Sequence, residues 1–299
     1  MKDYLAKAIT NDGMFRAYAI NATQMVTTAQ VKHDTWSAAS AALGRTLVAA
    51  TLLATSTDKS GKSITVKING GGPVGGIVVE ADSNGYAKGY VANPHTELTL
   101  NDKNEIDVGQ AVGVNGYLEV TKNVMDKEPY TSSVPLTSGE IGDDFTFYLA
   151  QSEQIPSALA VSVLVNSDNS IQVAGGYLIQ VLPGASEEAI SQLEEKLKTL
   201  PALSEMLIAN KTPEEILNQI FGEKQLQLLT TMPVEFYCNC SKERFANDLV
   251  GIPVDQLTAI RDEQHGMEIV CNFCHNKYEY SEEQLNAIID LASQSQQEK

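Results

Sequence analysis

The four cysteines of this 299-residue chain lie in two tight pairs, Cys238 with Cys240 and Cys271 with Cys274. A structural zinc site takes four sulfur or nitrogen ligands in a tetrahedron, usually as two close pairs from two separate turns. Thirty residues separate Cys240 from Cys271, enough for two short helices that fold back and bring the pairs together. We therefore predict one zinc ion per chain, with these four cysteines as its ligands.

Four thiolate ligands would give such a centre two negative charges, so hydrogen-bond donors and cations should surround it. Lys242, Arg244 and Lys277 flank the cysteines in the sequence. We expect them to supply part of the compensating charge, together with backbone N–H groups of the two turns. His265 and His275 are also close in sequence, but four cysteines complete the ligand set. We predict that both histidines lie outside it.

Two structural disulfides are the alternative use of these cysteines. The N-terminus shows no apolar signal segment, and no run approaches 18 apolar residues. We therefore predict a cytoplasmic protein without a membrane span. Thiols stay reduced in that compartment, where paired cysteines more often bind a metal or perform redox chemistry. The sequence thus favours zinc in the resting state, with oxidation within the pairs as a second state open to the same thiols.

Charge excludes two classes of partner. The formal net charge of the chain is −17, and residues 238–299 carry five Lys or Arg against eleven Asp or Glu. Such a surface repels nucleic acids and acidic membranes. A zinc ribbon that binds DNA or RNA would usually carry a basic stripe. A zinc-ribbon regulator therefore stays a weak alternative, which an absence of salt-sensitive retention on DNA or RNA would dismiss.

The first 183 residues have the mixture of helices and strands that is typical of an α+β domain. The segment from Trp36 to about Thr57 has apolar residues at helical spacing, with Asp34 or Thr35 as the expected cap. Asn84-Gly85 between two apolar segments predicts a type I′ hairpin. Strands follow one another without a regular helix between them, so we predict a mostly antiparallel sheet.

Residues 184–232 change to short amphipathic helices, which we interpret as a helical linker. Thr212-Pro213-Glu214-Glu215 is a capping box that opens one of them. Short helices in a row must pack on a neighbour to be stable. Residues 233–299 form a third part, a small C-terminal zinc-binding domain. There Ser241 and Ser281 are expected to begin helices, and Glu268 to Tyr280 a hairpin that carries the second cysteine pair.

Three apparent motifs fail because of their surroundings. Gly70 to Gly75 matches a dinucleotide-binding pattern, but a strand follows where a helix is required, so we expect a wide turn or close backbone packing. Gly61-Lys62-Ser63 resembles the end of a phosphate loop, but Ser56 stands where a glycine is needed. Asp143-Asp144 is interpreted as the solvated start of a strand. The sequence gives no sign of an enzyme.

A thiol–disulfide oxidoreductase is a further alternative. Such enzymes place C-x-x-C at a helix N-terminus in a βαβ setting. Cys271 and Cys274 instead lie in a predicted hairpin, and the tighter pair has no role in that chemistry. Turnover of a dithiol substrate with zinc retained would revive this alternative.

Beyond these patterns, the chain resembles the bacterial 33 kDa heat-shock chaperonin family, the redox-regulated holdases, essentially end to end. The paired-cysteine signature in this order is highly specific, and the other matching segments are moderately so. The segments that carry the resemblance are Ala42-Leu43-Gly44-Arg45, Gly71-Gly72-Pro73-Val74-Gly75-Gly76, Ser152-Glu153-Gln154-Ile155-Pro156-Ser157, Gly175-Gly176-Tyr177-Leu178-Ile179-Gln180, Thr212-Pro213-Glu214-Glu215-Ile216-Leu217, Cys238-Asn239-Cys240-Ser241-Lys242-Glu243-Arg244-Phe245 and Cys271-Asn272-Phe273-Cys274.

The resemblance implies an ATP-independent chaperone that is inactive as a reduced zinc protein. Peroxide with mild unfolding, or hypochlorite, would convert the ligands into two disulfides, Cys238–Cys240 and Cys271–Cys274, and release zinc. The linker would then lose structure, and the protein would bind unfolding clients under oxidative and heat stress. The resemblance further implies a homodimer when oxidised and hand-over of clients to ATP-driven foldase chaperones.

The residues support such a switch independently. A structural zinc contributes roughly 10–16 kcal/mol in small modules, against roughly 5–15 kcal/mol for the stability of a whole domain. The 62-residue module from Cys238 is small enough to need the metal, so its loss should unfold the module and weaken the linker. We expect the core of the module to comprise Phe245, Leu249, Ile260, Phe273 and Tyr278. We expect clients to bind apolar residues that linker unfolding exposes, namely Leu193, Leu197, Ile216, Leu217 and Ile220.

Overall fold

The computed structural model describes residues 2–57, 63–101, 106–123 and 128–297. The chain forms two compact units, Met1–Tyr237 and Cys238–Lys299. The segment 184–232 belongs to the first of these units. Its role as a linker stays a prediction, which is taken up below with the function.

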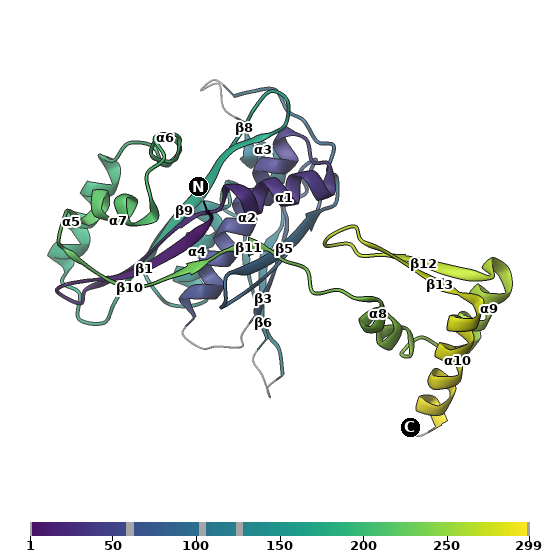
Figure 1. The fold of residues 1–299 in the computed structure, drawn as a ribbon. Coiled ribbons are helices and arrows are strands. Elements are labelled where there is room, and N and C mark those ends of the chain that lie inside the picture. The colour runs from purple at the N-terminus through teal and green to yellow at the C-terminus, as the bar shows by residue number, and fades with distance from the viewer. Residues whose placement is uncertain (1, 58–62, 102–105, 124–127, 298–299) are drawn as a thin grey trace. The chain divides into compact units, whose positions relative to one another are not determined.

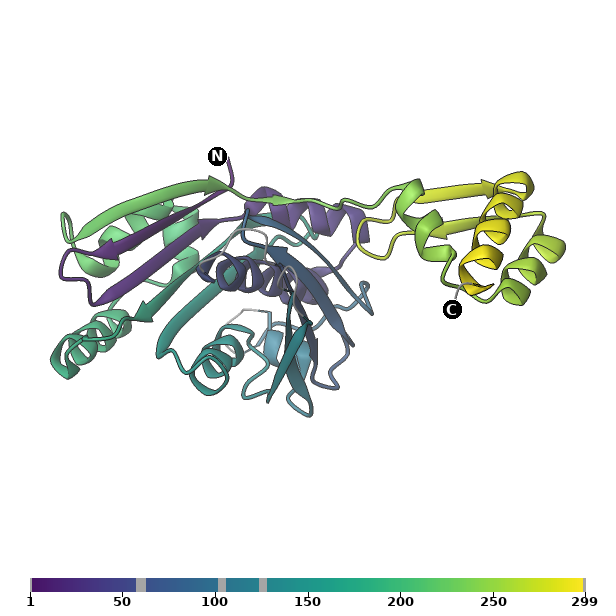
Figure 2. The ribbon, with the colours of Figure 1, turned by 90° about the horizontal axis from the view of Figure 1, so that it is seen from below.

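Antiparallel pairing builds the first sheet, in which β10 lies along β1 (Figure 2). Neighbouring strands run in opposite directions throughout this sheet. Within the part of the chain that the structure describes, its order is β10 (Leu226–Pro233), β1 (Tyr4–Thr10), β2 (Phe15–Asn21), β9 (Ile171–Val181) and β8 (Ser157–Val165).

The second sheet is also antiparallel except at one edge, where the short strand β11 runs parallel to β5. The predicted α+β class with mostly antiparallel sheets is confirmed. Among the described residues the order of this sheet is β11 (Glu235–Phe236), β5 (Tyr86–Val91), β4 (Ile77–Asp82), β3 (Ser63–Asn69), β6 (Tyr117–Asn123) and β7 (Tyr130–Pro135).

Helix α2 (Ser37–Ser56) forms the centre of the first unit, because it packs against strands of both sheets (Figure 1). By length and composition alone α2 would be able to span a membrane, a property that the search for long apolar runs in the sequence does not reveal. Of that apolar stretch, 94% is buried inside the fold, as expected for a core helix. The other helices of this part are α1 (Thr23–His33), α3 (Val108–Val112) and α4 (Gly142–Gln151).

The cap expected for this helix is wrong, since Trp36 occupies the N-cap position without a side-chain hydrogen bond. Thr35 instead directs its hydroxyl to that of Ser40, at 2.6 Å in the buried first turn.

The segment 184–232 contains three of the expected short helices, α5 (Glu187–Lys198), α6 (Leu203–Ile208) and α7 (Pro213–Phe221), which lie together on one face of the first sheet (Figure 1). The capping box is confirmed, because Thr212 and Glu215 exchange hydrogen bonds. The expectation of helices up to residue 232 is wrong. Leu226–Pro233 is strand β10, whose partner β1 lies more than two hundred residues earlier in the sequence, where no local pattern reveals it.

One turn prediction and one strand prediction are also corrected. The hairpin between β4 and β5 forms, but only Gly85 has a positive φ, so its turn is not type I′. The carboxylate of Asp82 accepts from the N–H groups of Asn84 and Tyr86 and stabilises a longer loop. Asp144 is no solvated strand start. It is fully buried in the first turn of α4, where it accepts from the N–H groups of nearby residues.

The glycine-rich segment packs as expected. A Cβ at Gly70 would lie 2.1 Å from the carbonyl oxygen of Gly113, so close backbone approach explains the glycine there. Gly61 and Lys62, from the segment that resembles a phosphate loop, lie outside the described residues.

The second unit places three helices around a hairpin. The hairpin strands are antiparallel, which confirms the expected hairpin, and Ser241 and Ser281 begin helices as expected. The core differs from the prediction, since α10 contributes Leu285, Ile288 and Ile289 to it, whereas Ile260 and Phe273 are only half-buried and lie outside the described cluster. The elements are α8 (Lys242–Leu249), α9 (Val254–Gln264), β12 (Gly266–Val270), β13 (Lys277–Ser281) and α10 (Glu282–Gln297).

Candidate metal centre

The hairpin and the segment before α8 hold the two cysteine pairs. Cys271 and Cys274 lie in the tight loop between β12 and β13, where the N–H of Cys271 donates to the carbonyl of Asn276 at 3.0 Å. The N–H of His275 donates back to the carbonyl of Cys271 at 2.8 Å, which closes the loop. Cys238 and Cys240 lie in the irregular segment just before α8. One pair therefore comes from a tight turn and the other from an irregular segment, so two separate parts of the chain supply the ligands, as is usual in structural metal sites.

All four sulfur atoms lie within 4.8 Å of one another. The Sγ atoms of Cys238 and Cys271 are 3.8 Å apart, and those of Cys240 and Cys274 are 3.3 Å apart. A tetrahedral metal with bonds of about 2.3 Å to sulfur would place its ligands about 3.8 Å apart. The donor set and its spacing therefore fit one soft metal ion.

The sulfurs of Cys238 and Cys271, and those of Cys240 and Cys274, are too far apart to be bonded, because a disulfide bond is about 2.05 Å long. All four cysteines are free. The C-x-x-C pair lies between two strands rather than at a helix N-terminus, so the oxidoreductase arrangement is missing from this pair.

Backbone N–H groups donate to two of the sulfurs, as the sequence predicted. The N–H of Cys240 reaches the sulfur of Cys238, and the N–H of Asn276 reaches that of Cys274. The phenol of Tyr278 lies 3.2 Å from the Cys240 sulfur. These donors partly balance the negative charge that ionised cysteines would concentrate here.

Burial and hydrogen bonding set the pKa values of the thiols apart. Burial raises the pKa of Cys238 strongly and that of Cys274 to about 11. Burial alone would also raise the pKa of Cys240, but hydrogen bonds from Tyr278 and the other thiols lower it to about 7. Cys238 and Cys274 would thus keep their protons at neutral pH unless a cation replaces them, so metal binding here releases protons.

The three cations expected near the sulfurs instead bind other side chains. Arg244 donates to the amide oxygen of Asn239 at 3.1 Å, Lys242 donates to Gln284 at 2.9 Å, and Lys277 forms an ion pair with Glu268. None of these three contacts is with a sulfur. Charge compensation by these residues stays a prediction.

The two histidines lie outside the sulfur cluster, as predicted. His265 ends α9 in a left-handed conformation, with Nδ1 3.3 Å from a carboxylate oxygen of Glu282. His275 occupies the hairpin loop, also with a positive φ, and is exposed.

Tyr278 and Tyr280 are the polar residues of the site that the sequence reasoning missed. Tyr278 was expected only as a core residue, and Tyr280 only as the end of the hairpin. The alternation Tyr-Glu-Tyr places both rings on one face of β13, which was the available signal. Their partners lie 38 residues earlier, so spacing alone could not identify them.

Comparison with known proteins places this fold and site in one family. A sequence profile of the family described as "Hsp33 protein" matches residues 3–281. The chain is 56% identical to a 33 kDa chaperonin of Levilactobacillus brevis, over 98% of this chain and 99% of the relative. It is 48% identical to a 33 kDa chaperonin of Enterococcus faecalis over the full length of both.

A solved structure agrees with these matches. The crystal structure of the 33 kDa chaperonin of Thermotoga maritima, also described as a heat shock protein 33 homolog, superposes with a TM-score of 0.89. The two chains are 32% identical, and the likeness covers 98% of this chain and all of the other. Sequence and fold thus agree over nearly the whole chain, and the protein belongs to the Hsp33 family of chaperones.

Proposed function

We propose that this protein is a redox-regulated holdase, a chaperone that binds unfolding proteins without ATP and is not an enzyme. In the resting form Cys238, Cys240, Cys271 and Cys274 hold one zinc ion. The ion would supply a cross-link between the segment before α8 and the β12–β13 hairpin. The observation that carries the proposal is the cluster of four free sulfurs in a chain of this family.

Oxidation of the thiols is the proposed switch. The four cysteines would enter this step as thiolates and would give two disulfides, Cys238–Cys240 and Cys271–Cys274, with the loss of four electrons. Two molecules of hypochlorous acid would accept these electrons together with two protons from the solvent and become two chloride ions and two waters. Disulfide sulfurs bind zinc poorly because the thiolate is the ligand. Rings that close only one or two intervening residues restrain little chain, so they would not replace the metal as a cross-link.

Loss of the cross-link would destabilise the first unit, because unfolding that begins in the second unit can spread along the connecting chain. Cys238 follows Tyr237, the last residue of the first unit, and strand β11 just before it pairs over only two residues. Strand β10 precedes β11 and lies at the edge of its sheet, largely exposed. Short edge strands are among the first elements to open. Unfolding that begins at Cys238 would therefore reach β10 and then the linker helices.

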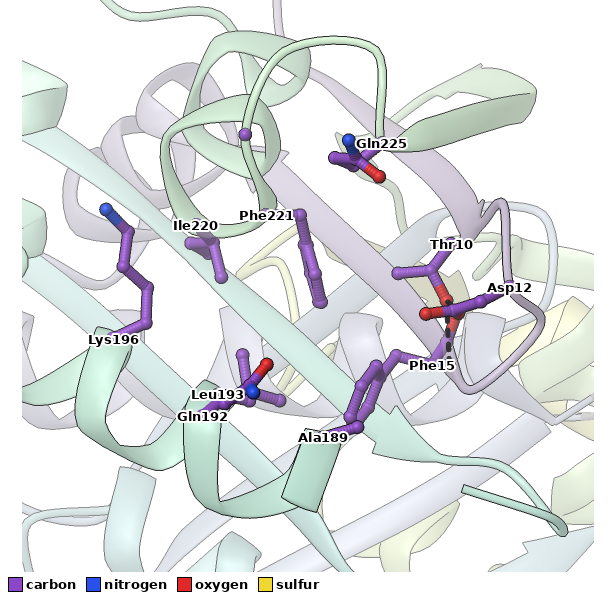
Figure 3. A pocket seen from close by; sticks show the side chains of 11 residues that line it. Thr10, Asp12, Phe15, Ala189, Gln192, Leu193, Lys196, Ile220, Phe221 and Gln225 are labelled. Atoms are coloured by element: carbon purple, nitrogen blue, oxygen red, sulfur yellow. Dashed lines mark hydrogen bonds between the residues drawn. The ribbon is translucent and has the colours of Figure 1, made fainter. Parts of the chain in front are cut away.

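Of the three linker helices, α5 has the fewest buried residues, which supports opening of the linker from α5. α5 contains no fully buried residue. A pocket of about 420 Å³, open to solvent, lies between α5, α7 and the β1–β2 turn and is lined by Leu193, Phe15 and Phe221 among others (Figure 3). Poor packing of this kind leaves few dispersion contacts to oppose opening.

Opening of these helices would expose an apolar surface for clients. Their inner faces pack on one cluster that also includes Phe15 and Ile179 of the sheet. Exposed patches of such residues bind other unfolded chains, while the net charge of −17 would keep the chaperone itself in solution. A homodimer in the oxidised state, hand-over of clients to ATP-driven foldases and action in the cytoplasm belong to the same proposal.

The test follows client binding and structure together. Charged substitutions at Leu193 and Leu197 should weaken the suppression of client aggregation by the oxidised protein and leave zinc binding by the reduced protein intact. A matched substitution at exposed Val31 of α1 controls for added charge. Unchanged client protection in the linker variants would refute this client surface.

A further inference from the structure

Tyr278 of β13 makes two contacts with a single cysteine. Its hydroxyl proton goes to the carbonyl oxygen of Cys240 at 3.1 Å, and the sulfur of Cys240, 3.2 Å from the same hydroxyl, can share that one proton when it is a thiolate. The ring packs against Phe245 of α8, with ring centres 5.3 Å apart. Packing therefore holds the phenol in place. The phenol reaches the first cysteine pair from β13, the strand that follows the second cysteine pair.

Tyr280 makes a similar contact two residues further along the same strand. Its hydroxyl donates to the carbonyl oxygen of Lys242 at 2.6 Å, and the Lys242 ammonium lies 5.0 Å from the centre of its ring. The two tyrosines thus tie the segment 240–242 to β13 at successive points. Of the two tyrosines, only Tyr278 has a described contact with a sulfur.

We propose that Tyr278 is a positioning residue that sets how tightly the metal is held and how fast Cys240 is oxidised. This inference rests on the proposed function. Hydrogen bonds from outer groups to metal ligands orient the ligands, and their loss typically lowers metal affinity 10- to 100-fold. A donor to a thiolate also withdraws electron density, and a less basic thiolate attacks an oxidant more slowly. The phenol would therefore raise the oxidant level needed to open the site.

The competing explanation is that Tyr278 only packs and ties the chain, as Tyr280 does. The two residues provide a matched pair for separating these roles. Tyr278→Phe and Tyr280→Phe each remove one hydroxyl from the same face of the same strand and keep the ring. Both lose a bond to a backbone carbonyl, but only the first loses a contact with sulfur.

The experiment measures both variants and the wild type as full-length reduced protein. Zinc affinity comes from competition with a chromophoric chelator, and zinc release from a stopped-flow mixture with hypochlorite. Substitution with Co²⁺ adds the sulfur-to-cobalt charge-transfer band, whose energy reports electron density on the sulfurs. Urea unfolding of each variant reports stability separately.

Tyr278→Phe should bind zinc about tenfold or more weakly, should release it correspondingly faster under hypochlorite, and should shift the cobalt band to lower energy. Tyr280→Phe should stay within about threefold of the wild type and leave the band in place, even where urea unfolding shows equal destabilisation. Equal effects of the two variants, or a Tyr278→Phe protein that matches the wild type, would overturn the inference and leave the redox switch standing. A wild type that binds no metal would overturn both.

Discussion

Replacement of Ile216 by alanine should open the linker without any oxidant. Ile216 lies on the inner face of α7, is 0% exposed, and packs in the cluster between the linker helices and the first sheet. Truncation leaves a cavity there, because the neighbouring side chains relax only in part. Large-to-small changes of this type cost about 2–5 kcal/mol.

The cost translates directly into the population of the opened linker. At about 3 kcal/mol, the equilibrium constant for opening rises roughly 150-fold, since each 1.4 kcal/mol is a factor of ten. A linker that opens once in ten thousand molecules would then open in about one or two per cent. The four-cysteine cluster lies in the other unit and is untouched by the change.

Ile208→Ala is the matched control, because it makes the same chemical change in the same segment at a side chain that is 48% exposed. Hydrogen exchange of the amides of α5 and α7 measures opening in the reduced, metal-bound protein, and aggregation of a heat-unfolded client measures its consequence. Ile216→Ala should show amide exchange about a hundredfold faster than Ile208→Ala and partial client protection. Faster exchange without any client protection would refute the claim that linker opening creates the client surface.

Two further changes test particular contacts in the first unit. Burial raises the pKa of Asp3 to about 6 even though its carboxylate accepts from the N–H of Met25. The folded state therefore binds this proton more tightly than the unfolded state, and stability falls as pH rises from about 4 to 6. Asp3→Asn should remove that fall and raise the free energy of unfolding by up to about 3 kcal/mol at pH 7.5, with no gain at pH 3.5. Urea unfolding at both pH values measures this difference. An equal change at the two pH values would contradict this reasoning. Ala189→Met should fill the pocket beside α5 and stabilise the linker by about 1 kcal/mol. The variant should then need a higher hypochlorite dose than the wild type before it protects a client. A lower dose for the variant would show that the pocket does not limit opening.

Local chemistry predicted the elements whose signals lie within a few residues. The Thr212 capping box, the helix after Ser241 and the hairpin that carries Cys271 all depend on neighbouring side chains, and the structure contains each of them. The four sulfurs were identified for the same reason, because ligand spacing within each turn is a local property.

Contacts between distant segments could not be predicted in this way. Strand β10 was expected to be helical because its partner β1 is far away in the sequence. Asp144 carries a charge that local reasoning placed in solvent, yet several backbone N–H groups compensate its burial. Tyr278 was expected only as a core residue, because its polar partner is the sulfur of Cys240, 38 residues earlier in the sequence. Long-range pairing and the satisfaction of buried polar groups emerge only in the folded chain.

The α10 residues also change the expected behaviour of the second unit. Leu285, Ile288 and Ile289 give it an apolar core that the sequence reasoning had left out. Loss of the metal should therefore loosen the cysteine turns first, while the packing of α9 and α10 persists longer. Near-ultraviolet and far-ultraviolet circular dichroism after chelation would separate the two steps.

The most direct test measures zinc content, free thiols and client protection on one sample, before and after mild oxidation without ATP. The account predicts that one zinc per chain is lost, that four thiols disappear and that suppression of client aggregation appears. Dithiothreitol with added zinc should reverse all three. Zinc that stays bound while client protection is absent or unchanged would contradict the redox switch and leave the four cysteines as a structural clamp.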